Sequence, residues 1–87
     1  LDAFDKLIEI LPANETLYAA MVLEDKGNVL EMMGDYEGAI IVFDRALELD
    51  PSNMYAMQEK GVALQSLGRI SEAETAFAKA KELGYEE

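Results

Sequence analysis

An interval of 34 residues repeats through this chain and constrains its fold more than any other feature. When residues 20–53 are aligned with residues 54–87, nine positions are identical. The identical pairs are Lys26 and Lys60, Gly27 and Gly61, Leu30 and Leu64, Gly34 and Gly68, Ala39 and Ala73, Phe43 and Phe77, Ala46 and Ala80, Glu48 and Glu82, and Leu49 and Leu83. A period of roughly 20 to 50 residues indicates stacked supersecondary units, each of which buries its apolar face against the next.

The pattern inside each unit is that of two helices. In the first unit, Leu23, Gly27 and Leu30 recur at helical spacing, Gly34 interrupts the pattern, and apolar residues around Phe43 resume it. A large side chain such as Phe43 opposite a small residue such as Gly27 lets two antiparallel helices approach closely. Each unit is therefore predicted to be a helical hairpin.

Residues that stop and start helices lie between these patterns. Pro12 and Pro51 prevent the preceding helix from continuing, and Asn14 and Asn53 are placed to cap the helix that follows. We predict helices over residues 2–11, 15–33, 37–49, 54–67 and 71–83.

The last helix has its own start and stop signals. Ser71 followed by Glu74 has the form of a capping box at its beginning. Gly84 followed by Tyr85 suits a left-handed stop with an apolar contact folded back.

With these residues in place, the chain resembles the tetratricopeptide repeat family. The residues that carry the resemblance are Gly27, Leu30, Gly34, Tyr36, Ala39, Phe43, Ala46, Leu49 and Pro51 in one unit, and Gly61, Leu64, Gly68, Ala73, Phe77, Ala80 and Leu83 in the next. The sequence departs from the family at Lys26 and Lys60, where the family favours Leu, at Leu23 and Met57, where it often has Trp, and at Tyr85, where it has Pro.

The resemblance implies an all-α fold, a right-handed solenoid of antiparallel helical hairpins with about five helices. Residues 1–14, which include FDKLIEILPAN, look like the second helix of a preceding repeat, because they are similar to FDRALELDPSN at residues 43–53. Residues 15–53 then form a first full repeat, and residues 54–87 a second. The second repeat is expected to be terminal, and the chain to be the C-terminal fragment of a longer protein.

Composition excludes several classes of function. The chain has 18 acidic and seven basic residues, a net charge of −11, which would repel a phosphate backbone, so no nucleic acid is expected. Without His or Cys it lacks the commonest general base, thiolate nucleophile and metal ligands. We therefore predict no enzyme activity, no catalytic residues, no cofactor and no metal site. No apolar run is long enough for a bilayer, and we expect a cytoplasmic protein without a membrane partner.

The resemblance also implies that the first helix of each repeat lines a concave surface. The predicted groove residues are Met21, Glu24, Asp25, Asn28, Glu31, Tyr55, Gln58, Glu59, Val62 and Gln65. Amide and carboxylate side chains can bind a peptide backbone and its Lys or Arg residues, so the expected partner is a neutral-to-basic protein segment. Some family members clamp a C-terminal carboxylate with basic residues. Only Asn28 matches that scheme here, so this ligand is disfavoured.

An alternative function is self-association through the N-terminal region. Phe4 and Phe43 are 39 residues apart rather than 34, so five extra residues, assigned to 15–19, lengthen the first helix of the first full repeat by about 7.5 Å. The apolar residues in question are Phe4, Leu7, Ile8, Leu11, Leu17 and Tyr18. Their burial against another copy would give a homodimer.

Overall fold

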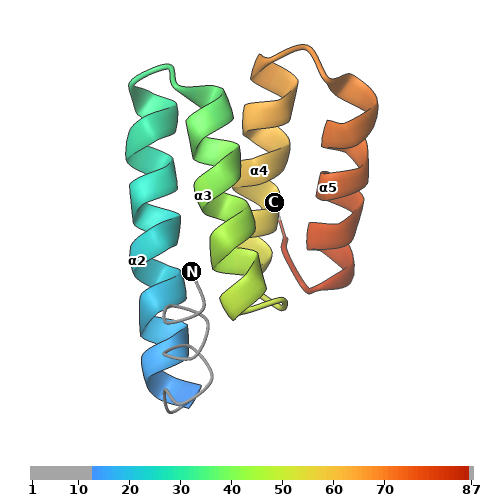
Figure 1. Cartoon of the computed structure of the whole chain (residues 1–87). Coiled ribbons are helices and arrows are strands. Elements are labelled where there is room, and N and C mark those ends of the chain that lie inside the picture. The colour runs from blue at the N-terminus through green and yellow to red at the C-terminus, as the bar shows by residue number, and fades with distance from the viewer. Residues whose placement is uncertain (1–12, 87) are drawn as a thin grey trace.

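The chain folds into two antiparallel helical hairpins placed side by side. The computed structural model describes residues 13–86, and the predicted helix over residues 2–11 lies outside them. The described helices are α2 (Ala13–Met32), α3 (Tyr36–Leu49), α4 (Met54–Ser66) and α5 (Ile70–Glu82). In Figure 1, α2 lies against α3 and α4 against α5, and α3 joins the hairpins by packing on α4. The described residues contain no strand, so this is an all-α helical repeat fold.

Inside each hairpin, a phenylalanine ring packs directly on a helical glycine. A Cβ atom added to Gly27 would lie 2.5 Å from Cε1 of Phe43, and one added to Gly61 would lie 2.5 Å from Cε1 of Phe77. Phe43 is completely buried, whereas Phe77 is only partly buried. The predicted pairing of large and small residues is confirmed in both hairpins.

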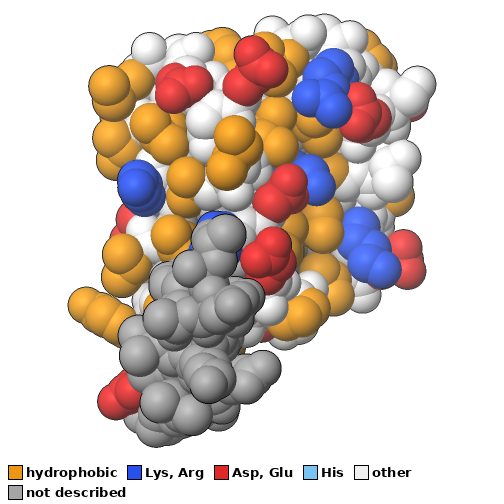
Figure 2. Space-filling model, in the orientation of Figure 1, with side chains coloured by type: hydrophobic (Ala, Val, Ile, Leu, Met, Phe, Trp, Pro, Cys, Tyr) orange, Lys and Arg blue, Asp and Glu red, His pale blue; other side chains and the backbone are white. Residues whose placement is uncertain are grey.

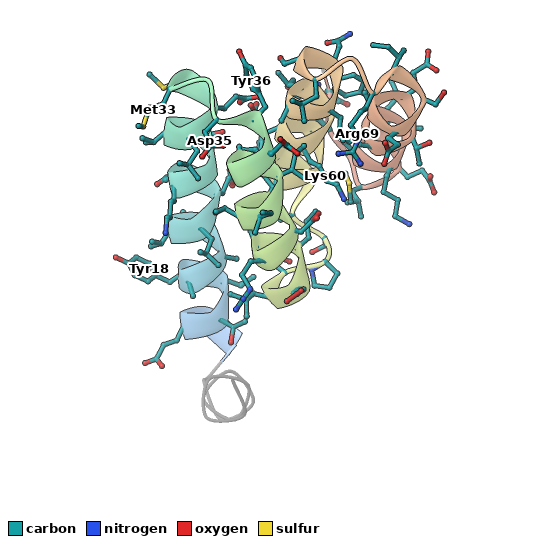
Figure 3. The ribbon with its side chains drawn as sticks, turned by 45° about the horizontal axis from the view of Figure 1, so that its top comes forward. Tyr18, Met33, Asp35, Tyr36, Lys60 and Arg69 are labelled. Carbon is teal, nitrogen blue, oxygen red and sulfur yellow. The ribbon has the colours of Figure 1, made fainter. Side chains whose placement is uncertain are left out.

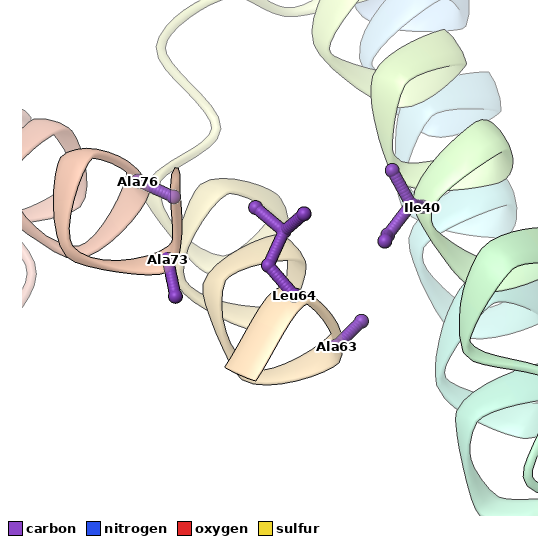
Figure 4. Packing of buried hydrophobic residues seen from close by; sticks show 5 residues of the cluster. All are labelled: Ile40, Ala63, Leu64, Ala73 and Ala76. Atoms are coloured by element: carbon purple, nitrogen blue, oxygen red, sulfur yellow. The ribbon is translucent and has the colours of Figure 1, made fainter. Parts of the chain in front are cut away.

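A shared core joins the two hairpins. Its buried residues are Ile40, Ala63, Leu64, Ala73 and Ala76. Figure 4 shows Ile40 on α3 facing Ala63 and Leu64 on α4. The two alanines of α5 lie on the other side of Leu64. The alanines keep the backbones close, so most of the apolar volume comes from Ile40 and Leu64.

Two of the predicted helix ends are confirmed. The Oδ1 atom of Asn53 accepts a hydrogen bond of 3.1 Å from the backbone N–H of Ala56, which makes Asn53 the N-cap of α4. At the end of α5, Gly84 has a φ of 113°, and the N–H of Tyr85 donates to the carbonyl of Ala80 at 2.9 Å. The ring of Tyr85 then packs edge-on against Tyr55 of α4, with 6.0 Å between ring centroids.

Two other predicted helix starts are wrong. Helix α2 begins at Ala13, so Asn14 lies inside it and does not precede it. Helix α5 begins at Ile70, which places Ser71 within the first turn rather than at the cap. The capping position belongs to Arg69, which makes no capping bond and instead pairs with Glu72 through contacts of 2.7 and 2.8 Å. This paired contact holds the first turn of α5 without a capping box.

The first helix is longer than its counterpart in the second hairpin. Helix α2 has 20 residues and includes residues 15–19, whereas α4 has 13 residues. The assignment of five extra residues to positions 15–19, made from the spacing of the phenylalanines, stays a prediction. In the described part of the chain, the added turn leaves Leu17 47% and Tyr18 69% exposed.

Candidate functional site on the α2 and α4 side

A hydrogen bond links α2 to the turn before α4. The Nδ2 atom of Asn53 donates to Oε1 of Glu24 over 3.4 Å, and Asn53 is only 8% exposed. Partial burial raises the pKa of Glu24, neighbouring carboxylates add to this rise, and the bond from Asn53 opposes it. Glu24 is therefore a carboxylate that would be stabilised by a cation placed beside it.

Two carboxyl groups meet farther along the same face. Glu31 of α2 and Glu59 of α4 are neighbours, and the burial of Glu31 together with its contact to Glu59 raises the pKa of Glu31 to about 7. Two acceptor groups held together in this way favour the uptake of one proton or the approach of one cation.

The face also presents acceptor atoms that have no donor. Among the described residues, Oδ1 of Asn28 and Oε2 of Glu31 are buried without a hydrogen-bond partner. A buried acceptor left without a donor costs free energy of about 1–3 kcal/mol. These two atoms have almost no accessible surface, so they are an unfavourable feature of the packing of α2 rather than acceptors open to a ligand.

A pocket of about 370 Å³ lies at one end of this face. It is lined by Met21, Glu24, Asp50, Ser52, Asn53, Met54 and Tyr55. The turn between α3 and α4 supplies Asp50, Ser52 and Asn53, and the sequence analysis did not assign these residues to the groove. The run Asp50-Pro51-Ser52-Asn53 was interpreted only as the end of one helix and the start of the next.

The predicted groove residues do not all meet in one place. Met21, Glu24 and Tyr55 line the pocket described above, and Asn28, Glu31 and Glu59 follow along the helices. Gln58 instead lines a separate hollow on the α5 side with Phe77 and Tyr85. Asp25 and Gln65 are exposed, and Val62 is partly buried.

The ion pairs found within residues 13–86 lie away from these carboxylates. Lys60 binds Asp44 of α3 at 2.7 Å, joining the two hairpins, and Arg45 lies 3.8 Å from Glu48. No ion pair found within residues 13–86 engages Glu24, Glu31 or Glu59. The acidic charge on the α2 and α4 side is therefore not neutralised within the described structure.

Two features are absent from residues 13–86, the part of the chain that the structure describes. These residues contain no group of three or more acidic side chains arranged to hold a metal ion. None of the helices α2 to α5 combines the length and the apolar character needed to cross a membrane.

Comparisons with known proteins agree with the geometry. The tetratricopeptide repeat family matches residues 20–53 and, in a second match, residues 42–75. A TPR repeat-containing protein of Methanocaldococcus jannaschii is 33% identical over 87 residues, which is 100% of this chain and 14% of that protein. The protein STIP1 homolog of Dictyostelium discoideum is 34% identical over 70 residues, covering 80% of this chain and 12% of that protein.

A third relative is a TPR repeat-containing thioredoxin of Arabidopsis thaliana, 38% identical over 47 residues, covering 54% of this chain and 7% of that protein. The chain thus spans 14% or less of the length of these three relatives. What they share with it is the repeat, and the repeat is also what the helices, the paired glycines and phenylalanines and the 34-residue period display. The chain belongs to the tetratricopeptide repeat family.

Proposed function

We propose that the chain is a non-enzymatic, cytoplasmic protein-interaction module whose α2 and α4 side binds a neutral-to-basic segment of another protein. One observation carries this proposal. Glu24, Glu31 and Glu59 lie along one side of the two hairpins, and none of them has an ion pair within residues 13–86. An unneutralised acidic surface attracts basic partners and speeds their association.

The chemistry of the face supports a peptide rather than a small anion. The carboxylate oxygens of Glu24 can accept from the N–H groups of a peptide backbone or of Lys and Arg side chains, because within the described residues Oε1 accepts only a long bond of 3.4 Å from Asn53. Met21 and Tyr55 are 60% and 54% exposed, and both can adapt to apolar side chains of the partner. The tetratricopeptide relatives support an interaction module, while the charge preference rests on these residues.

The test is a capture experiment from source lysate. We expect the wild-type chain to retain partners that a Glu24→Lys, Glu59→Lys double variant loses, most clearly at low salt, because screening weakens charge attraction. A Glu74→Lys, Glu82→Lys variant is the matched control, because it makes the same change of charge at exposed positions on α5. Equal loss in both variants, or equal retention in all three proteins, would contradict a function located on the α2 and α4 side.

A second candidate, self-association, rests on the opposite edge of the first hairpin. Val22 and Val29 of α2 and Met33, directly after it, are 48%, 53% and 73% exposed. The residues 34 positions later are Ala56 and Ala63 of α4 and Leu67, directly after it, and the two alanines are completely buried where α4 meets α3. The same face of α2 is thus uncovered in the described structure.

The figures show how far this uncovered region extends. In Figure 2, hydrophobic side chains gather over α2 and α3 on the left of the view. Figure 3 shows two side chains pointing away from the other helices, Tyr18 from the first half of α2 and Met33 from the residue after its end. The predicted residues Phe4, Leu7, Ile8 and Leu11 lie outside the described residues.

Sedimentation at several concentrations tests self-association. If α2 mediates it, Val29→Glu together with Met33→Glu gives a monomer at concentrations where the wild type dimerises. Ile70→Glu is a control, since Ile70 is also half exposed but lies on α5. A wild type that stays monomeric at every concentration would exclude this candidate and leave the groove hypothesis unaffected.

A further inference from the structure

The pocket between α2 and the α3–α4 turn combines a partly buried acid with apolar walls. Glu24, Asp50 and Ser52 supply oxygen atoms, and Met21, Met54 and Tyr55 supply the walls. Its volume of about 370 Å³ is near the lower end of the range for ligand sites. A group the size of one side chain suits this space better than a folded element does.

We propose that this pocket receives one cationic side chain, arginine or lysine, of the bound segment. This deepens the proposed function and rests on it, because it names the residue of the partner that the α2 and α4 side recognises. The aliphatic part of the side chain lies along the methionines, and the charged head reaches Glu24.

The oxygen atoms of the pocket determine the sign of the charge that the ligand carries. The Oε1 atom of Glu24 accepts only the long bond of 3.4 Å from Asn53, while Oδ1 of Asp50 accepts from the N–H and hydroxyl of Ser52 at 3.3 and 2.9 Å. Asp50 is therefore satisfied locally, and Glu24 is the acid that remains weakly bonded. An ammonium or guanidinium group offers the charge-assisted hydrogen bonds that Glu24 lacks.

The walls of the pocket favour a long cationic side chain over a metal ion. Lys and Arg carry several methylene groups that bury against apolar surface while the charged head stays near polar atoms. Methionine adapts its shape to such a stem, and Tyr55 offers an aromatic ring that attracts a cation. The methyl and methylene groups of Met21 and Met54 would contribute nothing to the binding of a bare metal ion.

The pocket occurs once in the described chain because it requires two successive hairpins. Its acid comes from α2 and its opposite wall from the start of α4. At the position equivalent to Glu24, 34 residues later, the chain has Gln58, which carries no charge and lines a different hollow. A single cationic anchor is thus expected for each bound segment.

The test uses small probes and needs no knowledge of the partner. Protein labelled at its methionine methyl groups is titrated by NMR with acetyl-arginine methylamide, acetyl-lysine methylamide and acetyl-citrulline methylamide, a neutral analogue of arginine. We expect saturable shifts at Met21 and Met54 with both cations and none with citrulline. Met33, which points away from the other helices at the far end of α2, is the internal reference.

A variant and a pH series examine the same site independently. Glu24→Gln should weaken the binding of the cationic probes about tenfold, as expected when a hydrogen bond to a charged group is lost. Glu74→Gln on α5 should leave their binding unchanged. In the wild type, lowering the pH until Glu24 is protonated should abolish the shifts, and this measurement does not depend on any variant folding. The stronger of the two cationic probes identifies the preferred side chain.

Several results would overturn the pocket proposal. They are shifts as large with citrulline as with arginine, unchanged affinity in Glu24→Gln at full folding, or no saturable shift with either cation up to about 20 mM. The last outcome combined with partner loss in the Glu24→Lys, Glu59→Lys capture would refute the pocket alone. Binding of the cationic probes without any captured partner would refute the proposed function and leave the pocket standing.

Discussion

Replacing Gly27 with alanine tests the central packing contact of the first hairpin. The new methyl carbon would lie 2.5, 2.7 and 2.9 Å from three carbons of the Phe43 ring. Carbon atoms pack without strain at about 3.5–4.0 Å, so the ring has to move by about 1 Å. Because Phe43 is completely buried, the ring has no free space to enter.

The magnitude follows from two opposing effects. Overpacking a core by one methyl group costs about 1–3 kcal/mol. Alanine in a helix interior is more favourable than glycine by about 1 kcal/mol. We expect a net loss of about 0–2 kcal/mol in the free energy of unfolding at Gly27, toward the upper end because three ring carbons lie within 2.9 Å of the new methyl carbon. Each kcal/mol lost lowers Tm by about 4–8 °C for a domain of this size.

The second hairpin supplies an internal comparison. A Cβ atom at Gly61 would meet Phe77 at 2.5 Å as well, but Phe77 is partly exposed and its ring can turn outward. Gly61→Ala should therefore cost less than Gly27→Ala and fall near zero.

Urea unfolding followed by circular dichroism measures the free energy of unfolding of both variants. The double variant Gly27→Ala, Phe43→Leu measures the coupling between positions 27 and 43. In the leucine background, the alanine should no longer destabilise, because the ring carbons that it meets are gone. If Gly27→Ala stabilises the protein with Phe43 intact, the close contact between the two helices is not as described.

Three further predictions concern charge and capping. The pKa of Glu31 is raised from 4.5 to about 7 in the folded chain, so folding stability should fall as the pH rises between these values. In thermal melts measured across that pH range, Glu31→Gln should make Tm less dependent on pH. Alanine replacements of Lys60 and Asp44, alone and together, should show a coupling of about 0.5 kcal/mol that shrinks in 1 M salt, on the order expected for a partly exposed ion pair. Asn53→Ala should cost about 1–2 kcal/mol in urea unfolding, more than Asp35→Ala at the exposed cap of α3, because it removes a buried cap and the bond to α2.

The parts of the fold that depend on local sequence could be predicted. Helical periodicity, the proline and asparagine between hairpins and the glycine opposite each phenylalanine all act within a few residues or within one hairpin. The cap at Asn53 and the stop at Gly84 follow from the same local chemistry. The predicted start of α5 is wrong because Arg69 donates from Nε and Nη2 to the carboxylate of Glu72, and no capping pattern describes that contact.

The parts of the candidate site that depend on how hairpins meet could be predicted only in outline. The resemblance to the family predicts which helix faces would line a groove, and it places Glu31 and Glu59 in one set. It did not indicate that these two carboxyls would be neighbours, since that depends on the angle between α2 and α4. It also gave no reason to assign Asp50 and Ser52 to a pocket, because a turn contributes to a surface only after both flanking helices are placed.

The contact of each phenylalanine with its glycine lies within a single hairpin and uses no residue of the neighbouring one. Tandem duplication or deletion of one 34-residue segment therefore preserves the inside of every hairpin and changes only the number of junctions. At a junction, few side chains have to fit: Ile40 packs against the alanine and leucine of the next helix, and Ala56 of that helix shares a buried cluster with Phe43. A gene encoding such a chain can gain or lose whole units by recombination while the contacts inside each hairpin are preserved.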